Sequence, residues 1–229
     1  MNKLYIAGDS FATLSKNQLI GSSWSEILAE QYNFKLVNVS RVAASNFSIA
    51  IQLDWITSKV TENDFVIVLL TDHTRQTLVN LDVEKESKSH LIEYHSEYDT
   101  QRTSEEINLS SKPRLISSTI HHTGKTKSFY RDWFDVEVQE FQDRLVLTGA
   151  FAHLSEKTKR FLVCKGGYSE ASSEKFCLDE NNYVSLTAQT MKNWSEPLNS
   201  ETSNHMDSMA HKKVSIYFKK YLEKFYKDR

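Results

Sequence analysis

Apolar positions in the first 70 residues follow two alternating patterns, short continuous runs and helical spacings. The first run, 4–7, and the third, 65–70, have the length and continuity of strands that are buried on both faces of a parallel sheet, and residues 34–39 between them predict a further strand. Before the third run, apolar residues recur at i, i+4, i+7 and i+11, on one face of a predicted helix: Ile49, Leu53, Ile56 and Val60.

Polar residues mark where the two early helices begin. Ser23 and Glu26 form a Ser-x-x-Glu capping box ahead of Ile27, and Ser45 or Asn46 is placed to cap the second helix. Strands and helices therefore alternate, which predicts an α/β fold with a central parallel sheet and helices on both faces.

The middle of the chain lacks this pattern. Residues 82–128 are rich in Ser, Thr, Lys, Glu and His and poor in apolar residues. We interpret them as a polar insertion or long loop excursion, with a hairpin or with disorder over part of its length. The insertion then belongs to a single domain that spans residues 1–229.

Periodicity returns after this segment. A helix is predicted from about 131 to about 157, with an apolar face of Phe134, Val138, Phe141 and Leu145. A strand follows at 160–164, and a short strand is predicted near 183–186. The last helix starts after Asp207, a good N-cap, and has an apolar face of Ala210, Val214, Tyr217, Phe218, Tyr221, Leu222 and Phe225.

Composition and charge narrow the classes of function. The chain has 229 residues and a formal net charge of −2, so no global basic field points to nucleic acid. A lysine run in the last helix, which includes Lys212, Lys213 and Lys219, is interpreted as a solvated face, with nucleic-acid binding as the weaker alternative. Neither a signal peptide nor a membrane span is recognisable, which favours a cytoplasmic protein without membrane contacts.

Cysteine usage gives no indication of a metal site. Cys164 and Cys177 leave a disulfide geometrically open but form no disulfide framework, and no Cys or His cluster has zinc-like spacing. We therefore expect no metal site, and nothing in the sequence implies an organic cofactor.

Candidate chemistry begins at the turn after the first strand, Gly8-Asp9-Ser10. Ligands of open α/β sheets bind at the carboxyl ends of strands, where Ser10 would present its hydroxyl. The alternative is an ordinary turn in which Asp9 or Ser10 acts as a cap.

Two later segments hold groups that a serine nucleophile needs. Small residues at 43–45 precede Asn46, whose side-chain amide can donate to an oxyanion, although a helix cap is an equally good interpretation. His205 lies just before the last helix and could act as the base that activates Ser10. His211 lies one turn into that helix, where packing or capping is the better interpretation.

Together these segments resemble the GDSL/SGNH esterase–lipase superfamily, over residues 3–75 and about 200–225. The layout is most similar to divergent members, found often in large tailed bacteriophages, that carry Ser-Asn in the second block and a Thr…Arg motif after the third strand. The resemblance implies a three-layer, flavodoxin-like α/β/α fold with Ser10 as nucleophile and His205 as base. It also implies that the backbone amides of Ser10 and Ala43 join Asn46 in the oxyanion hole.

The chain departs from the family pattern in two blocks. Asp72 stands near the position of a family Asn, and an ionised Asp cannot donate to an oxyanion, so either Asn46 or Arg75 supplies the donor or the oxyanion hole is weaker. Thr202 stands where the family has an Asp three residues before the His. Glu201 or Asp207 could orient His205 instead, while Asp9 remains a further site candidate.

The resemblance implies a hydrolase for a small-molecule or carbohydrate ester, namely an esterase, deacetylase or thioesterase. Aromatic residues around the insertion would border the substrate or simply pack the insertion onto the core: Tyr94, Tyr98, Phe129, Tyr130 and Trp133. The alternative is an inactive binding or assembly protein with the same fold, for example a phage structural or host-interaction component.

Overall fold

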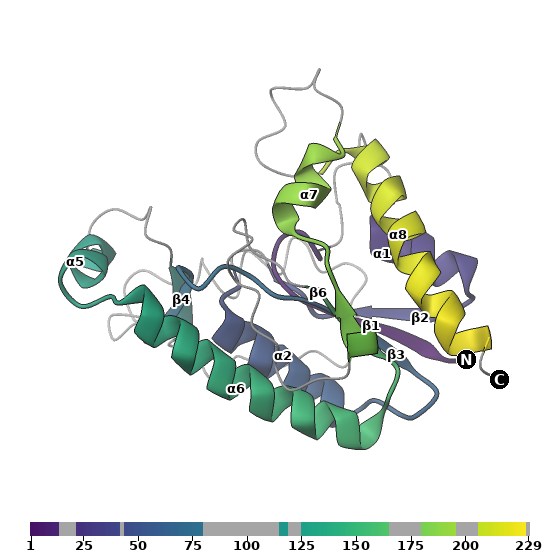
Figure 1. Cartoon of the computed structure of the whole chain (residues 1–229), viewed down its shortest axis with the longest axis horizontal. Helices are drawn as coiled ribbons and strands as arrows, with labels where there is room; N and C mark the ends of the chain where they lie inside the picture. Colours follow the sequence, from purple (N-terminus) through teal and green to yellow (C-terminus); the bar gives the residue numbers. More distant parts are fainter. Residues whose placement is uncertain are drawn as a thin grey trace.

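A computed structural model gives the architecture for residues 1–13, 22–41, 44–79, 115–118, 125–164, 180–195 and 206–227. Its centre is a five-stranded sheet in which every neighbouring pair is parallel, in the order β2-β1-β3-β6-β7 (Figure 1). The strands are β1 Lys3–Ala7, β2 Lys35–Asn38, β3 Phe65–Leu69, β6 Phe161–Cys164 and β7 Tyr183–Val184. This is the flavodoxin-like order 2-1-3-4-5, which confirms the predicted α/β fold.

The sheet is covered on both faces, so it forms the middle of three layers (Figure 1). Helices α1 Trp24–Gln31 and α8 Ser208–Lys227 pack together on one face, where the Trp24 and Phe218 rings lie 4.8 Å apart. Helices α2 Asn46–Thr57 and α6 Val136–Lys157 cover the other face. Alternate residues of β1 supply the two cores, with Leu4 on the α8 side and Tyr5 on the α2 side. Burial on both sides explains why the inner strands are continuous apolar runs.

Both early helices begin where the sequence predicts. The Ser23 side chain and Glu26 form a reciprocal capping box at α1. Ser45 caps α2 by accepting a hydrogen bond from the Ser48 amide, so Asn46 is the first helical residue. These local bonds satisfy amides that have no partner within the helix.

The long helix differs from the prediction in its start and in its buried face. Helix α5 spans Lys125–Asp132, and α6 begins only at Val136, because the Asp135 side chain accepts hydrogen bonds from the amides of Glu137 and Val138. The residues that α6 buries are Asp143, Leu147, Phe151 and Leu154. Of the predicted apolar face, Val138, Phe141 and Leu145 are exposed, and Phe134 precedes the helix. Periodicity alone could not choose, since the helix carries apolar residues on both sides.

The polar excursion starts and ends at paired strands. Strand β4 Gln76–Val79 runs antiparallel to β5 Leu115–Ser118, with Gln76 opposite Ser118. Most of the predicted insertion at 82–128 lies outside the described residues, and its extent stays a prediction. Short elements complete the chain: η3 Glu180–Asn182 and α7 Ala188–Asn193.

Cys164 ends β6 as a free, fully buried thiol, and burial raises its pKa well above the ordinary range. The disulfide that the sequence left open is therefore not formed, while Cys177 lies outside the described residues. No helix in the described part of the chain is both long enough and apolar enough to cross a bilayer.

Candidate functional site

Gly8 makes a tight turn at the carboxyl end of β1. Its φ of +152° is a conformation that side-chain-bearing residues rarely adopt, and an added Cβ would lie 2.9 Å from the Leu69 carbonyl oxygen. The Gln52 side chain accepts a hydrogen bond from the Gly8 amide at 2.8 Å and donates to the Gly8 carbonyl at 3.3 Å. The backbone leading into Ser10 is thereby fixed by β3 on one side and by α2 on the other.

Asp9 connects this turn to the loop that follows β3. One carboxylate oxygen accepts from the Phe11 amide at 3.0 Å, and the other accepts from the Thr71 hydroxyl and from Arg75 Nη1, each at 3.0 Å. The Asp9 side chain is only 4% exposed, so these donors replace the water that a buried carboxylate loses. Asp9 and Arg75 therefore position the turn.

Ser10 follows at the carboxyl edge of the sheet and is 8% exposed. Its carbonyl oxygen accepts a hydrogen bond from the Thr13 hydroxyl at 2.8 Å. Within the described ranges, no hydrogen-bond partner is found for the Ser10 amide or hydroxyl. The hydroxyl that a nucleophile needs and the amide that an oxyanion hole needs are therefore not hydrogen-bonded to any described residue.

Asp72 shapes the loop after β3. Its carboxylate accepts from the Thr74 amide at 2.8 Å, and its carbonyl accepts from the Arg75 amide at 3.1 Å. The side chain closes a local turn of the kind in which Asp is favoured.

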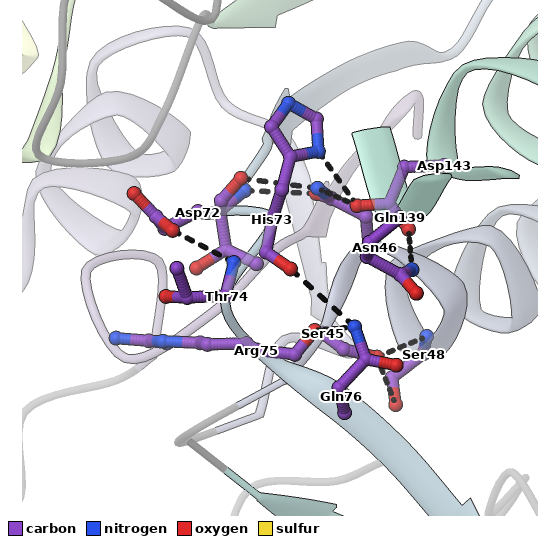
Figure 2. Close-up of polar contacts among 11 residues, drawn as sticks. Ser45, Asn46, Ser48, Asp72, His73, Thr74, Arg75, Gln76, Gln139 and Asp143 are labelled. Carbon is purple, nitrogen blue, oxygen red and sulfur yellow. Dashed lines mark hydrogen bonds and ion pairs between the residues drawn. The ribbon is translucent and has the colours of Figure 1, made fainter. Parts of the chain in front are cut away.

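Asn46 is buried, and its amide group is engaged within the protein (Figure 2). Nδ2 donates to the Thr71 carbonyl at 3.1 Å and to Asp143 Oδ2 at 2.8 Å, while Oδ1 accepts from the Thr71 amide at 3.0 Å. These bonds use both hydrogens of the amide nitrogen. To contact an oxyanion, the side chain would have to release one of them.

Asp143 is the residue that the sequence reasoning missed. It projects from the inner face of α6, with a side chain only 2% exposed, and receives hydrogen bonds from three elements (Figure 2). Oδ2 contacts Asn46 and lies 2.8 Å from His73 Nδ1, and Oδ1 accepts from Gln139 Nε2 at 2.7 Å. The sequence does contain a signal: one acidic residue, Asp143, shares a helix face with the apolar residues Leu147, Phe151 and Leu154.

His73 is the titratable partner in this network. Burial lowers the pKa of its imidazole, but the hydrogen bond to Asp143 and the charges of Asp143, Glu140 and Asp72 outweigh that effect. The net result is a pKa raised above 6.5. A protonated imidazole next to a buried carboxylate stabilises the loop against α6.

The raised pKa of His73 predicts a pH-dependent stability. The contribution is fully present below pH 6.5, the unfolded value, and is lost as pH rises through the raised folded pKa. We expect the urea midpoint of the protein to fall across that window, and His73→Gln to flatten this part of the profile. Urea unfolding between pH 6 and pH 9 measures it. Parallel losses of stability in protein and variant would contradict the assignment.

The remaining predicted residues lie near or before α8. Ala43, Glu201 and His205 fall outside the described residues, so their roles stay predictions. Asp207 accepts from the Ala210 amide at 2.8 Å and begins α8 as predicted. His211 is buried, and its Nδ1 accepts from the Trp24 amide at 3.2 Å, which confirms a packing role.

The structure therefore gathers Asp9, Ser10, Asn46, Asp72 and Arg75 around the carboxyl ends of β1 and β3. Hydrogen bonds link Asp9 to Thr71 and Thr71 to Asn46, so the three predicted blocks at 8–10, 45–46 and 71–75 form one connected unit. Across the described segments, no group of three or more His, Cys, Asp or Glu side chains is arranged to hold a metal ion.

Comparison with known proteins supplies a likeness of fold. No protein-family model and no curated protein matches the chain. Among solved structures, it is similar to the psychrotrophic esterase EstA from Pseudoalteromonas sp., in a crystal structure inhibited by monoethylphosphonate. The TM-score is 0.51 at 11% identity, over 99% of this chain and 100% of that one. This likeness shows a shared fold.

Proposed function

We propose that the protein is a serine hydrolase acting on an ester, a divergent relative of the GDSL/SGNH esterase–lipase superfamily, with Ser10 as nucleophile. The observation that carries this proposal is the position of Ser10 at the carboxyl end of β1, in a fold shared with an esterase. Gly8 and the buried ion pair of Asp9 and Arg75 support it, because they hold the serine backbone in one conformation.

In this mechanism His205 accepts the hydroxyl proton as Ser10 Oγ attacks the ester carbonyl carbon. The tetrahedral oxyanion is held by the backbone amides of Ser10 and Ala43. As the carbon–oxygen bond to the leaving group breaks, His205 returns the proton to the departing alkoxide. Water, deprotonated by His205, then attacks the acyl carbonyl carbon; the bond to Ser10 Oγ breaks, His205 returns the proton to Oγ, and the acid is released.

Side chains around this pair have supporting roles. Glu201 or Asp207 would orient the His205 imidazole, and loss of such a carboxylate lowers the rate without abolishing a Ser–His pair. Asn46 is the candidate third oxyanion donor, but its hydrogen bonds to Thr71 and Asp143 favour a positioning role. We assign the substrate as a small-molecule or carbohydrate ester, with esterase, deacetylase and thioesterase chemistry equally compatible with these groups.

A fluorophosphonate probe tests the nucleophile directly. An activated serine forms a covalent phosphonyl adduct, whereas an ordinary hydroxyl does not. We expect one adduct per chain, on the peptide that contains Ser10, detected by mass spectrometry. Ser10→Ala should abolish it, and Ser22→Ala, at an exposed serine just before α1, should not.

A catalytically weakened binding protein is the second candidate. The two side chains that could donate to an oxyanion already have partners within the protein, which favours this candidate. Asn46 donates to Thr71 and Asp143, and Arg75 donates to Asp9. In that case a folded protein would give no adduct. Absence of labelling at Ser10 would therefore reject the hydrolase and favour the binding protein.

A further inference from the structure

The outward face of α6 is unusually apolar for a surface helix. Val138 is 54%, Phe141 50% and Leu145 58% exposed. These residues lie on the side opposite Leu147 and Phe151, which pack into the core. We call these three residues the outer stripe; half-buried Phe134 lies in the turn before α6, with its ring 5.1 Å from that of Tyr130. Clustered apolar side chains of this kind mark an interaction surface.

The spacing of the outer stripe is that of a helix-pairing seam. Its members are separated by three and four residues, as in the a and d positions of a coiled coil. Farther along the same face come the small residues Thr148, Gly149 and Ala152. A Cβ added to Gly149 would meet nothing within 4 Å, so a second helix could approach closely there. The face from 138 to 152 extends about 21 Å at 1.5 Å per residue.

Charged residues beside the outer stripe favour a second copy of α6 as the partner, in the antiparallel orientation. Glu137 and Arg144 stand seven residues apart, on the same edge of the stripe. A parallel copy of α6 would place uncharged Gln142 and Gly149 opposite them. An antiparallel copy with Val138 packed beside the partner's Phe141 instead places Glu137 next to the partner's Arg144, and the two-fold axis repeats this pair.

We propose that the protein forms a two-fold symmetric homodimer through antiparallel contact of the outer stripes of two α6 helices. Val138 packs against the partner's Phe141 at the centre of the contact. Glu137 pairs with the partner's Arg144 at each end. Arg144 already lies with its guanidinium 5.3 Å from the centre of the Phe141 ring, at the edge of the seam.

The interface and the candidate site share one helix. Phe141 and Leu145 face outward, whereas Asp143 between them faces inward to Asn46 and His73. Dimerisation therefore covers the outer side of the helical turn that supplies Asp143. The proposal does not depend on the activity of Ser10.

Sedimentation equilibrium of the full chain tests the proposal, with variants in which the charges of Glu137 and Arg144 are reversed. The parent should sediment at twice the 26.5 kDa chain mass. Glu137→Arg and Arg144→Glu should each raise the dimer dissociation constant by about tenfold or more, because like charges then face each other. The double exchange should restore the parent value, since opposite charges meet again. Lys220→Glu, at an exposed position on α8, is the matched control.

Phe141→Asp provides an independent test at the centre of the seam. It buries two carboxylates against apolar side chains, so the dissociation constant should rise by more than about a hundredfold. Circular dichroism verifies that the variant remains folded. A parent that is monomeric at 100 µM would overturn the proposal. So would a dimer that survives Phe141→Asp, or one for which the double exchange is no better than the single exchanges.

Discussion

Replacement of Ser10 by Ala is expected to lower kcat/KM for p-nitrophenyl acetate by roughly 10⁴-fold or more, because the acyl acceptor is removed. Backbone donors that remain can still bind the ester, so a small residual rate above that of water is expected. His205→Ala should cause a loss of similar size. The double variant should be little worse than either single variant, since nucleophile and base act as one unit.

The loss of kcat/KM in Ser10→Ala reports on catalysis only if the variant is as stable as the parent. The Ser10 hydroxyl has no hydrogen-bond partner within the described part of the chain, so Ala at this position should unfold at the parent urea concentration. Ser22→Ala is the matched control and should keep full activity, because this serine is exposed. Equal turnover by Ser10→Ala and the parent would exclude Ser10 as the nucleophile.

The second large effect is expected at Asp143, as a loss of stability. Asp143→Ala removes the acceptor for Asn46 Nδ2 and Gln139 Nε2 and the partner of His73, all on the inner side of α6. Buried donors left without acceptors each cost about 1–3 kcal/mol, so a net loss of about 3 kcal/mol is reasonable. Urea unfolding at pH 7 measures it, with an unchanged m-value as the sign that only stability has changed.

Two variants test whether the loss of stability comes from the hydrogen bonds of Asp143 rather than from a change in α6 itself. Glu156→Ala lies at an exposed position of the same helix and should change the free energy of unfolding by less than about 0.5 kcal/mol. Asp143→Asn keeps one acceptor oxygen, so its free energy of unfolding should lie between those of Asp143→Ala and the parent. If Asp143→Ala and Glu156→Ala unfold at the same urea concentration, the contacts of Asp143 do not stabilise the fold.

Much of the candidate site could be predicted because its signals are local. Gly8-Asp9-Ser10 directly follows an apolar run, and a serine at the end of a parallel strand lies at a known edge of the sheet. The partners of Asp9 were not predictable in the same way. Thr71 and Arg75 lie 62 and 66 residues away, and they approach only because β1 and β3 are neighbours in the sheet.

Asn46 shows how tertiary contacts engage the side chain of a predicted site residue. Its position at the start of α2 was readable from the Ser45 cap and the apolar spacing that follows. Its amide was expected to face a substrate. Asp143, 97 residues later in the chain, instead accepts one of its hydrogens, because α6 packs against α2.

The sequence by itself determined the strands of the parallel sheet, the starts of α1, α2 and α8, and the position of Ser10, because each depends on neighbours within about four residues. Tertiary structure alone decided which side of α6 is buried. Apolar residues line both sides of that helix, so its periodicity fits two orientations equally well. Packing of Leu147 and Phe151 against α2 and the sheet, with Asp143 bonded to Asn46 and His73, selects one orientation and leaves Phe141 and Leu145 on the surface.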